Sequence, residues 1–306
     1  MKKSLFYGWS GLVLLLFCCF GSCKKTPSPT FNPINPLQSL INTDTNFSLF
    51  HRMILQANDA GLVGNDAITF LIPVNSAFRA AGYTETTIDS TPSSTADRLV
   101  RFHYITTKVI PDGNVYTGYP TLLGYTIYGM TDSAHQVWFN GTPVTGDTSM
   151  PGNVLVYRLS ALLQPSEDSL DILLGNDSSL SFLAEVFRRT HLDSVLFSGN
   201  FTLLAPVNSA FITAGYDSVG AIDLADSNAL VQLVKYHTLT GDYFTNILMG
   251  QTSVPTLQGS SVTISTQGGS LKFSGGSNPV PANFLYGNQL AGNTLIVHRI
   301  DQILSP

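Results

Sequence analysis

The chain contains one six-residue motif twice, and this repeat constrains its fold more than any other feature. Pro-Val-Asn-Ser-Ala-Phe occurs at residues 73–78 and again at 206–211, and both copies soon continue into Ala-Gly-Tyr. Leu-Val-Arg-Phe-His at 99–103 then returns as Leu-Val-Lys-Tyr-His at 233–237. The offsets are 133 and 134 residues, about the length of one domain. A period this long predicts a duplicated domain in which each copy has its own core.

The first residues resemble the signal of a bacterial lipoprotein. Lys2 and Lys3 precede a largely apolar stretch over 5–20, and small residues stand directly before Cys23. The apolar stretch is short for a helix that spans a membrane. We expect residues 1–22 to be removed and Cys23 to be acylated. An uncleaved signal anchor and an ordinary signal peptide are the alternatives.

Cysteine usage and charge exclude several classes of function. All three cysteines (Cys18, Cys19 and Cys23) lie in the signal segment, so the rest of the chain has no thiol for a disulfide, for catalysis or for a cysteine-rich metal site. Only 11% of the residues are charged and the net charge is −5. Without a basic stripe, the chain is not expected to bind nucleic acid.

Composition along the chain predicts four segments. Residues 1–22 are the lipoprotein signal peptide, and the proline-rich residues 23–36 are expected to form a tether between the lipid and the first domain. The first domain is expected over residues 37–164 and the second over residues 165–306, with a short hinge at 165–168.

Each predicted domain mixes helical and strand patterns. Apolar residues recur at helical spacing over 48–62 and 178–192, whereas 68–72 and 201–205 are β-rich runs that stop at a proline. Further strands are expected at the segments 261–265, 270–273, 154–159 and 294–300.

The repeated motif predicts a strand, a proline stop and a short helix. Asn75 and Asn208 stand where the N-cap of that helix is expected. Gly82 and Gly215 stand where the helix would end in a left-handed residue.

Each copy also places a histidine on the apolar face of a second helix. His103 follows Leu99 and Val100 at helical spacing, as His237 follows Leu233 and Val234. We expect both imidazoles to face the core, where backbone or polar neighbours satisfy their nitrogens.

These motifs together resemble the fasciclin-like (FAS1) domains. Residues 201–211 resemble the first box of the family, 233–237 the second box with its Tyr-His pair, and 293–301 the closing strand. The resemblance implies an α+β fold of two tandem FAS1-like domains, each a β-sandwich-like wedge with flanking short helices. It also implies extracellular adhesion, without catalysis and without a cofactor.

The family motifs identify a set of structural residues, and the first domain departs from some of them. Phe102 replaces the tyrosine of the Tyr-His pair, Tyr157 replaces the closing histidine, and Ser160 replaces the closing aspartate. The residues expected to be structural are Pro73, Asn75, Phe78, Pro206, Asn208, Phe211, His298 and Asp301.

Two regions could take part in binding. The Tyr-His region of the family is linked to adhesion, so Tyr236 and His237, with Phe102 and His103 in the first copy, form a candidate interaction region. Trp138 belongs to an aromatic group over residues 116–139 that could either fill a sheet core or stack on sugar rings.

No pattern of catalytic residues supports an enzyme. The chain has no Gly-x-Ser-x-Gly elbow and no His-Glu-x-x-His motif, and its carboxylates are scattered. We expect no catalytic, cofactor or metal site.

The sequence therefore favours a non-catalytic adhesion or interaction protein of the cell envelope. We expect an outer-membrane lipoprotein that faces the periplasm or the surface, held by its N-terminal lipid and binding an unidentified protein or glycan. The alternative is a glycan-binding accessory lipoprotein of a polysaccharide-uptake system.

Overall fold

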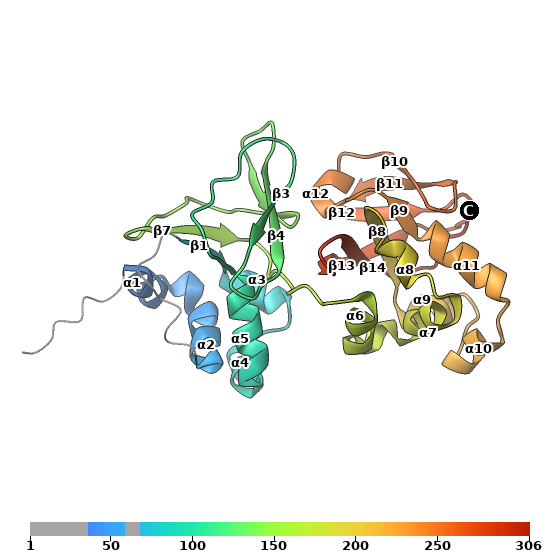
Figure 1. The fold of residues 1–306 in the computed structure, drawn as a ribbon, viewed down its shortest axis with the longest axis horizontal. Helices are drawn as coiled ribbons and strands as arrows, with labels where there is room; N and C mark the ends of the chain where they lie inside the picture. The colour runs from blue at the N-terminus through green and yellow to red at the C-terminus, as the bar shows by residue number, and fades with distance from the viewer. Residues whose placement is uncertain (1–35, 59–67) are drawn as a thin grey trace, which may run out of the picture. The chain divides into compact units, whose positions relative to one another are not determined.

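The helices and strands follow one another as two sets with a similar order of elements (Figure 1). This computed structural model describes residues 36–58 and 68–306. We call the elements from α1 to β7 the first domain and those from α6 to β14 the second domain. The first domain contains α1 (Pro36–Thr43), η1 (Thr45–Phe47), α2 (Ser48–Ala57), β1 (Ile68–Pro73), α3 (Asn75–Ala80), α4 (Glu85–Ser90), α5 (Ser93–Phe102), β2 (Tyr104–Ile105), β3 (Thr117–Pro120), β4 (Thr126–Thr131), β5 (Val137–Phe139), β6 (Thr142–Pro143) and β7 (Val154–Leu159).

The second domain has a similar order, with the short helices α8 and α12 in addition to those described in the first domain and with longer strands near its end. Its elements are α6 (Leu170–Asn176), η3 (Ser178–Leu180), α7 (Ser181–Thr190), α8 (Asp193–Leu196), β8 (Phe201–Pro206), α9 (Asn208–Thr213), α10 (Val219–Leu224), α11 (Ser227–Tyr236), β9 (Thr238–Thr240), α12 (Thr245–Leu248), β10 (Ser253–Pro255), β11 (Ser261–Gln267), β12 (Ser270–Ser274), β13 (Ala282–Ala291) and β14 (Leu295–Ile300).

In both domains the strand before the repeated motif pairs with the closing strand. β1 runs parallel to β7 and antiparallel to β2, and β8 runs parallel to β14 and antiparallel to β9. In the second domain these strands belong to one sheet with the order β10-β11-β12-β13-β14-β8-β9. In the first domain the sheet β2-β1-β7 is separate from the sheet β3-β4-β5-β6.

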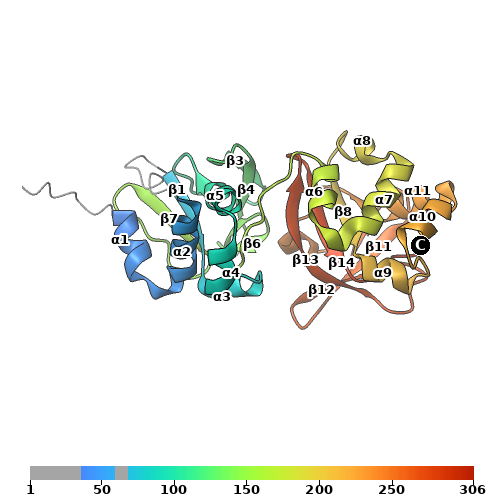
Figure 2. The same ribbon diagram turned by 90° about the horizontal axis from the view of Figure 1, so that it is seen from below.

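The paired central strands are buried on both faces, which is consistent with their largely apolar sequences. In β1, Phe70 and Ile72 join the core formed with the helices, whereas Leu71 faces the core with the second sheet. In β8, Leu203 and Leu204 divide in the same way. Each domain is therefore a wedge of strands with most of its short helices on one side. Figure 1 shows these helices below the strands of each domain, and Figure 2 shows the same side from below. The predicted α+β fold of two tandem domains of one kind is confirmed.

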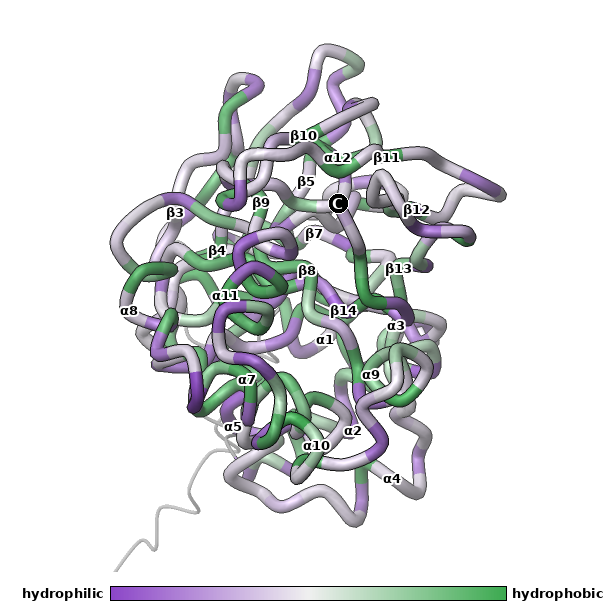
Figure 3. Tube along the Cα trace, turned by 90° about the vertical axis from the view of Figure 1, so that its right-hand side faces the viewer, coloured by the Kyte–Doolittle hydropathy of each residue, from purple (hydrophilic) through white to green (hydrophobic). Residues whose placement is uncertain are grey.

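The helices obtain their stability from amphipathic faces. In α7, Leu183, Val186 and Phe187 are buried, while Arg188 is exposed on the opposite side. Figure 3 shows the resulting alternation of green apolar and purple polar stretches along the helical segments. The run predicted at 178–192 begins as the 3₁₀ helix η3, and α2 ends at Ala57, before residues 59–67, which lie outside the described residues.

The expected N-cap role of the motif asparagines is wrong. Val74 and Val207 are the N-caps of α3 and α9, and neither asparagine caps its own helix. Instead, Asn75 Oδ1 accepts a hydrogen bond from Leu49 N at 3.0 Å and thereby caps α2. The first backbone amides of a helix have no partner within that helix, and a side-chain oxygen from a distant segment can accept from them as well as a local one.

Asn208 makes the equivalent bonds in the second domain. Its Oδ1 accepts from Phe182 N at 3.0 Å, and its Nδ2 donates to Ser178 O and Ser181 Oγ, both at 3.0 Å. The motif therefore fixes the first long helix of each domain against the strand-to-helix turn.

The glycine part of the prediction is confirmed. Gly82 and Gly215 follow α3 and α9 with φ of +84° and +95°, a left-handed conformation that favours glycine.

The expected signal peptide, the lipidated Cys23 and residues 23–35 of the expected tether lie outside the described residues, and Pro36 is the first residue of α1. Among the helices that the structure describes, none combines the length and the apolar character needed to cross a bilayer.

Candidate functional site

The histidines of the repeated motif are core residues in both domains. His103 and His237 have no exposed surface and follow the last residues of α5 and α11. Nδ1 of His237 donates to Leu233 O at 2.8 Å, and its Nε2 accepts from Leu304 N at 2.9 Å. His103 bonds Leu99 O and Leu163 N in the same way, at 2.9 and 3.2 Å. Each imidazole therefore ties a helix end to the last segment of its domain.

Both histidines are neutral at physiological pH. Burial lowers the pKa of His103 and of His237 to about 4. The hydrogen bond from Nδ1 to a backbone carbonyl raises the pKa, but its effect is smaller than that of burial. A proton on Nε2 would also remove the acceptor for the backbone amide of Leu163 or Leu304.

The aromatic residues before these histidines are buried as well. Phe102 has no exposed surface, and Tyr236 is 1% exposed, with its hydroxyl donating to Ser261 O at 3.2 Å. The structure thus brings together Tyr236 with His237, and Phe102 with His103, as internal supports. Any partner of this candidate region would contact the residues around them.

The closing strands β7 and β14 bond the same segment of their domains through different side chains. Nε2 of His298 donates to Tyr243 O at 2.8 Å, and its Nδ1 accepts from Asn288 N at 3.2 Å. In the first domain, the hydroxyl of Tyr157 donates to Val109 O at 3.1 Å. Val109 and Tyr243 hold the same place, six residues after the motif histidine. The Tyr157 replacement therefore preserves the connection to this segment.

Asp301 closes the second domain through its neighbouring strand. Its Oδ1 accepts from Asn283 N at 2.6 Å, and its Oδ2 accepts from the side-chain amide of Asn283. Ser160 in the first domain reaches only Pro143 O, at 3.3 Å.

The aromatic group of the first domain divides in two: Tyr119 and Tyr125 pack on the core of their own domain, whereas Tyr116 and Tyr128 pack against the second domain. Tyr116 packs against Phe244 of the second domain with ring centroids 4.7 Å apart, and its hydroxyl donates to Asn246 Oδ1 at 2.7 Å. The hydroxyl of Tyr128 donates to Asn293 O at 2.7 Å. With Leu290 and Ile296, these rings form an apolar cluster at the junction of the domains.

The segment expected to be a hinge is bonded to both domains. Glu167 N donates to Leu290 O at 3.0 Å, and Gly292 N donates to Glu167 O at 2.7 Å. The carboxylate of Glu167 also receives Arg98 Nη2 of the first domain at 2.8 Å. The backbone of this segment thus adds to the end of β13.

Trp138 lies on β5 and is half-buried. Its indole Nε1 donates to Asp132 Oδ2 at 2.8 Å, and this bond is the main cause of the lowered pKa of Asp132. The indole also lines a cleft of about 1080 Å³ to which both domains contribute.

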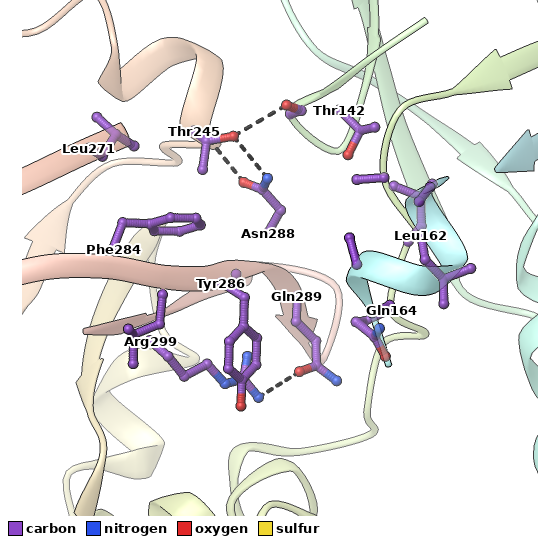
Figure 4. A pocket seen from close by; sticks show the side chains of 18 of the residues that line it. Thr142, Leu162, Gln164, Thr245, Leu271, Phe284, Tyr286, Asn288, Gln289 and Arg299 are labelled. Carbon is purple, nitrogen blue, oxygen red and sulfur yellow. Dashed lines mark hydrogen bonds between the residues drawn. The ribbon is translucent and has the colours of Figure 1, made fainter. Parts of the chain in front are cut away.

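Several polar side chains of this cleft are paired with one another (Figure 4), although the buried Nη1 of Arg299 has no hydrogen-bond partner. Asn288 Oδ1 accepts from Thr245 N at 2.9 Å, and Gln289 Oε1 accepts from Arg299 Nη2 at 2.7 Å. The hydroxyl of Tyr286 donates to Asp177 Oδ2 at 3.1 Å. A ligand would have to compete with these internal bonds.

Arg299 is the charged group at the floor of the cleft. It is 2% exposed, lies 4.9 Å from the centroid of the Tyr286 ring and pairs with Asp177 at 3.2 Å. Burial alone would raise the pKa of Asp177, but hydrogen bonds from Ser179 and the charge of Arg299 lower it. Arg158 and Asp44 form the same pair in the first domain, at 3.0 Å, so the pair is a repeated element of the fold.

Within residues 36–58 and 68–306, no group of three or more His, Cys, Asp or Glu side chains has the geometry to hold a metal ion.

Comparison with known proteins identifies the fold. The family model for the fasciclin domain matches residues 45–165 and 178–306. The chain belongs to the fasciclin domain family. Both copies of Pro-Val-Asn-Ser-Ala-Phe, the pairs Phe102-His103 and Tyr236-His237, and both closing strands lie within the matched residues.

Relatives of the fasciclin domains share part of their length with this chain. Periostin of Homo sapiens is 29% identical over 155 residues, which are 50% of this chain and 18% of periostin. Immunogenic protein MPB70 of Mycobacterium bovis is 28% identical over 146 residues, 46% of this chain and 70% of that protein. A solved FAS1 domain pair from the insect cell adhesion molecule Fasciclin I has a TM-score of 0.40 and 16% identity, over 85% of this chain and 97% of that chain.

Sequence reasoning missed the residues that join the two fasciclin domains. Phe244 and Asn246 carry no motif, and Tyr116 and Tyr128 were grouped only as aromatic residues. The signal that could have found Phe244 is its place directly after Tyr243, where the aligned first domain has Ile110.

Proposed function

We propose that the chain is an exported, lipid-anchored protein that binds extracellular or envelope partners through its two fasciclin domains, without catalysis. The match of both domains to the family carries this proposal, since the family resemblance implies adhesion. The residues that differ between the domains, rather than the shared buried motifs, are then the ones that select a partner. Two domains joined by a short segment can also engage one partner together.

The anchor is proposed to be an acyl chain on Cys23. Cells that express the full chain would be labelled with a palmitate analogue, and the wild-type protein is expected to carry the label and to partition with membranes. Cys23→Ala should lose both properties. Unlabelled wild type, or equal labelling of the variant, would reject the anchor.

Adhesion is tested separately with purified residues 24–306 immobilised on a surface. We expect saturable attachment of cells or of an extracellular matrix protein. The control is the same protein after unfolding in acid, which should lose attachment. Absence of saturable attachment would reject the adhesive role while leaving the anchor untouched.

Glycan capture is the second candidate. What favours it is that Trp138 from the first domain and Tyr286, which is 48% exposed, from the second line one cleft. Aromatic rings at the wall of a cleft can stack on sugar rings. A glycan array should then show binding that Trp138→Ala removes while the circular dichroism spectrum is unchanged. Binding that survives this substitution would place any glycan elsewhere.

A further inference from the structure

One face of the fasciclin fold is covered in the second domain and bare in the first. Phe244 is 2% exposed because Tyr116 and Tyr128 pack on it. Ile110 holds the same place in the first domain, seven residues after the motif histidine, and is 70% exposed. Phe244 is thus covered at the junction, whereas the equivalent Ile110 is exposed.

The segment 108–112 lies between β2 and β3, outside the sheets, and its exposed and buried residues alternate as they would in an extended chain. We call its exposed side the edge. Lys108, Ile110 and Asp112 are exposed, whereas the residues between them are buried. Val109 N donates to Thr69 Oγ1 at 2.8 Å, and Pro111 O accepts from Thr131 Oγ1 at 2.7 Å, so the backbone of the alternate residues points inward. In the described part of the chain, no hydrogen bond engages the backbone N–H or C=O of Ile110.

The charges of this edge are symmetric about Ile110. Lys108 stands two residues before it and Asp112 two residues after it. Lys108 Nζ contacts Met150 Sδ at 2.9 Å, and neither Lys108 nor Asp112 forms an ion pair with the residues that the structure describes. Met150, 54% exposed, extends the apolar surface beside Ile110.

We propose that residues 108–112 form a docking edge for a second copy of this chain. Two edges pair antiparallel about a twofold axis at Ile110, and each Ile110 exchanges its N–H and C=O bonds with that of the other copy. This register places each Lys108 opposite the second copy's Asp112. A twofold contact requires such self-complementary charges, and this segment has them. Pro111 does not interfere, because its missing N–H belongs to the inward side.

The inference concerns contacts between copies of this chain and does not depend on the adhesive role. The paired surface is small, so the dimer is weak, with a Kd of about 0.1 to 1 mM in solution. An anchored protein would reach such concentrations locally more readily than a free one.

The test is sedimentation of residues 24–306 at concentrations up to about 1 mM. The wild type is expected to show a concentration-dependent dimer. Lys108→Glu, which sets like charges opposite each other, should weaken it by about tenfold or more. The double variant Lys108→Glu with Asp112→Lys restores opposite charges and should recover the dimer. Ile110→Glu should abolish it.

Leu224→Glu is the matched control, because Leu224 is 90% exposed on α10 without flanking charges of this symmetry. It should leave the dimer unchanged. Circular dichroism would confirm that each variant is folded, which is expected since all substituted side chains are exposed. A wild type that stays monomeric overturns the proposal. A dimer that persists in Ile110→Glu, or that the double variant fails to recover, overturns it as well.

Discussion

The two fasciclin domains make the same internal hydrogen-bonded connections with partly different residues. Thr69 of β1 and Thr202 of β8 both donate to the segment after the motif histidine, to Thr107 O at 2.9 Å and to Gly241 O at 2.8 Å. The closing strand reaches the same segment through Tyr157 in one domain and through His298 in the other. The connection is retained although the side chain differs. The divergent closing motif of the first domain therefore replaces the histidine without losing the bond that it makes.

The domains differ most where β13 has no full counterpart. β13 pairs with both β12 and β14 and so unites one sheet. β6 covers only Thr142–Pro143, and its side of β7 receives isolated bridges at Val144 and Ser149. The sheet of the second domain is therefore completed by the long strand β13, whereas the first domain has the short strand β6 and isolated bridges at this place.

Acid should produce the largest difference in stability between the two domains. Burial lowers the pKa of His103, His237 and His298 to about 4, against 6.5 for an ordinary histidine. The unfolded chain therefore binds more protons between pH 6.5 and 4, and stability is full above this range and falls as pH falls through it. Each histidine accounts for about 3 kcal/mol at pH 4. The second domain, with two of them, should unfold first.

Hydrogen exchange followed separately in each domain from pH 7.5 to 4.5 would measure this difference. His298→Gln should bring the pH dependence of the second domain close to that of the first. Earlier opening of the first domain on acidification would contradict the comparison.

The next largest contrast lies at Phe244 and Ile110. Phe244→Ala should lower the free energy of unfolding by about 3 kcal/mol, because it empties a buried position between Tyr116 and Tyr128. Ile110→Ala should change it by no more than about 0.5 kcal/mol in dilute solution, because Ile110 is exposed. Urea unfolding would measure both, and equal losses would mean that the junction at Phe244 does not form.

The motif asparagines should behave alike in the two domains. Asn75→Ala and Asn208→Ala each remove a cap on a distant helix and should each cost about 1 to 2 kcal/mol in thermal unfolding. The neighbouring exposed serines, Ser76 and Ser209, provide controls whose substitution by alanine should be almost neutral. A clear effect in one domain alone would show that the shared motif has different roles.

The smallest effect is expected at a surface pair that only the first domain has. Arg79 Nη2 lies 3.3 Å from Glu85 Oε1, and both side chains are about half exposed. Ile212 and Val219 hold the corresponding places in α9 and α10. Arg79→Ala should change the melting free energy by no more than about 0.5 kcal/mol. A loss of stability well above this value would contradict the prediction and show that the exposed pair has a structural role.

The repeat predicted two domains of one kind, and the resemblance of its motifs to the family predicted their α+β fold. The β-rich runs at 68–72 and 201–205 predicted strands, and helical spacing placed His103 and His237 in the core, where both lie. These predictions succeed because periodicity and burial are local properties of a sequence.

The predictions that failed concern partners distant in the chain. Asn75 was expected to cap its own helix, but its acceptor bonds an amide 26 residues earlier. The aromatic residues over 116–139 could be recognised as a group, yet their contact with Phe244 depends on how two domains meet. No local pattern encodes such contacts, because they arise only after each domain has folded.

The placement of β14 has a consequence for biosynthesis. This strand pairs with β8, although β9 to β13 all come between them in the chain, and Leu304 N, which follows β14, bonds His237. The second domain therefore cannot complete its sheet before β14 has been synthesised, whereas the first domain can close as soon as β7 has been made. Loss of residues 295–304 would leave β8 without its parallel partner and expose apolar surface to chaperones and proteases.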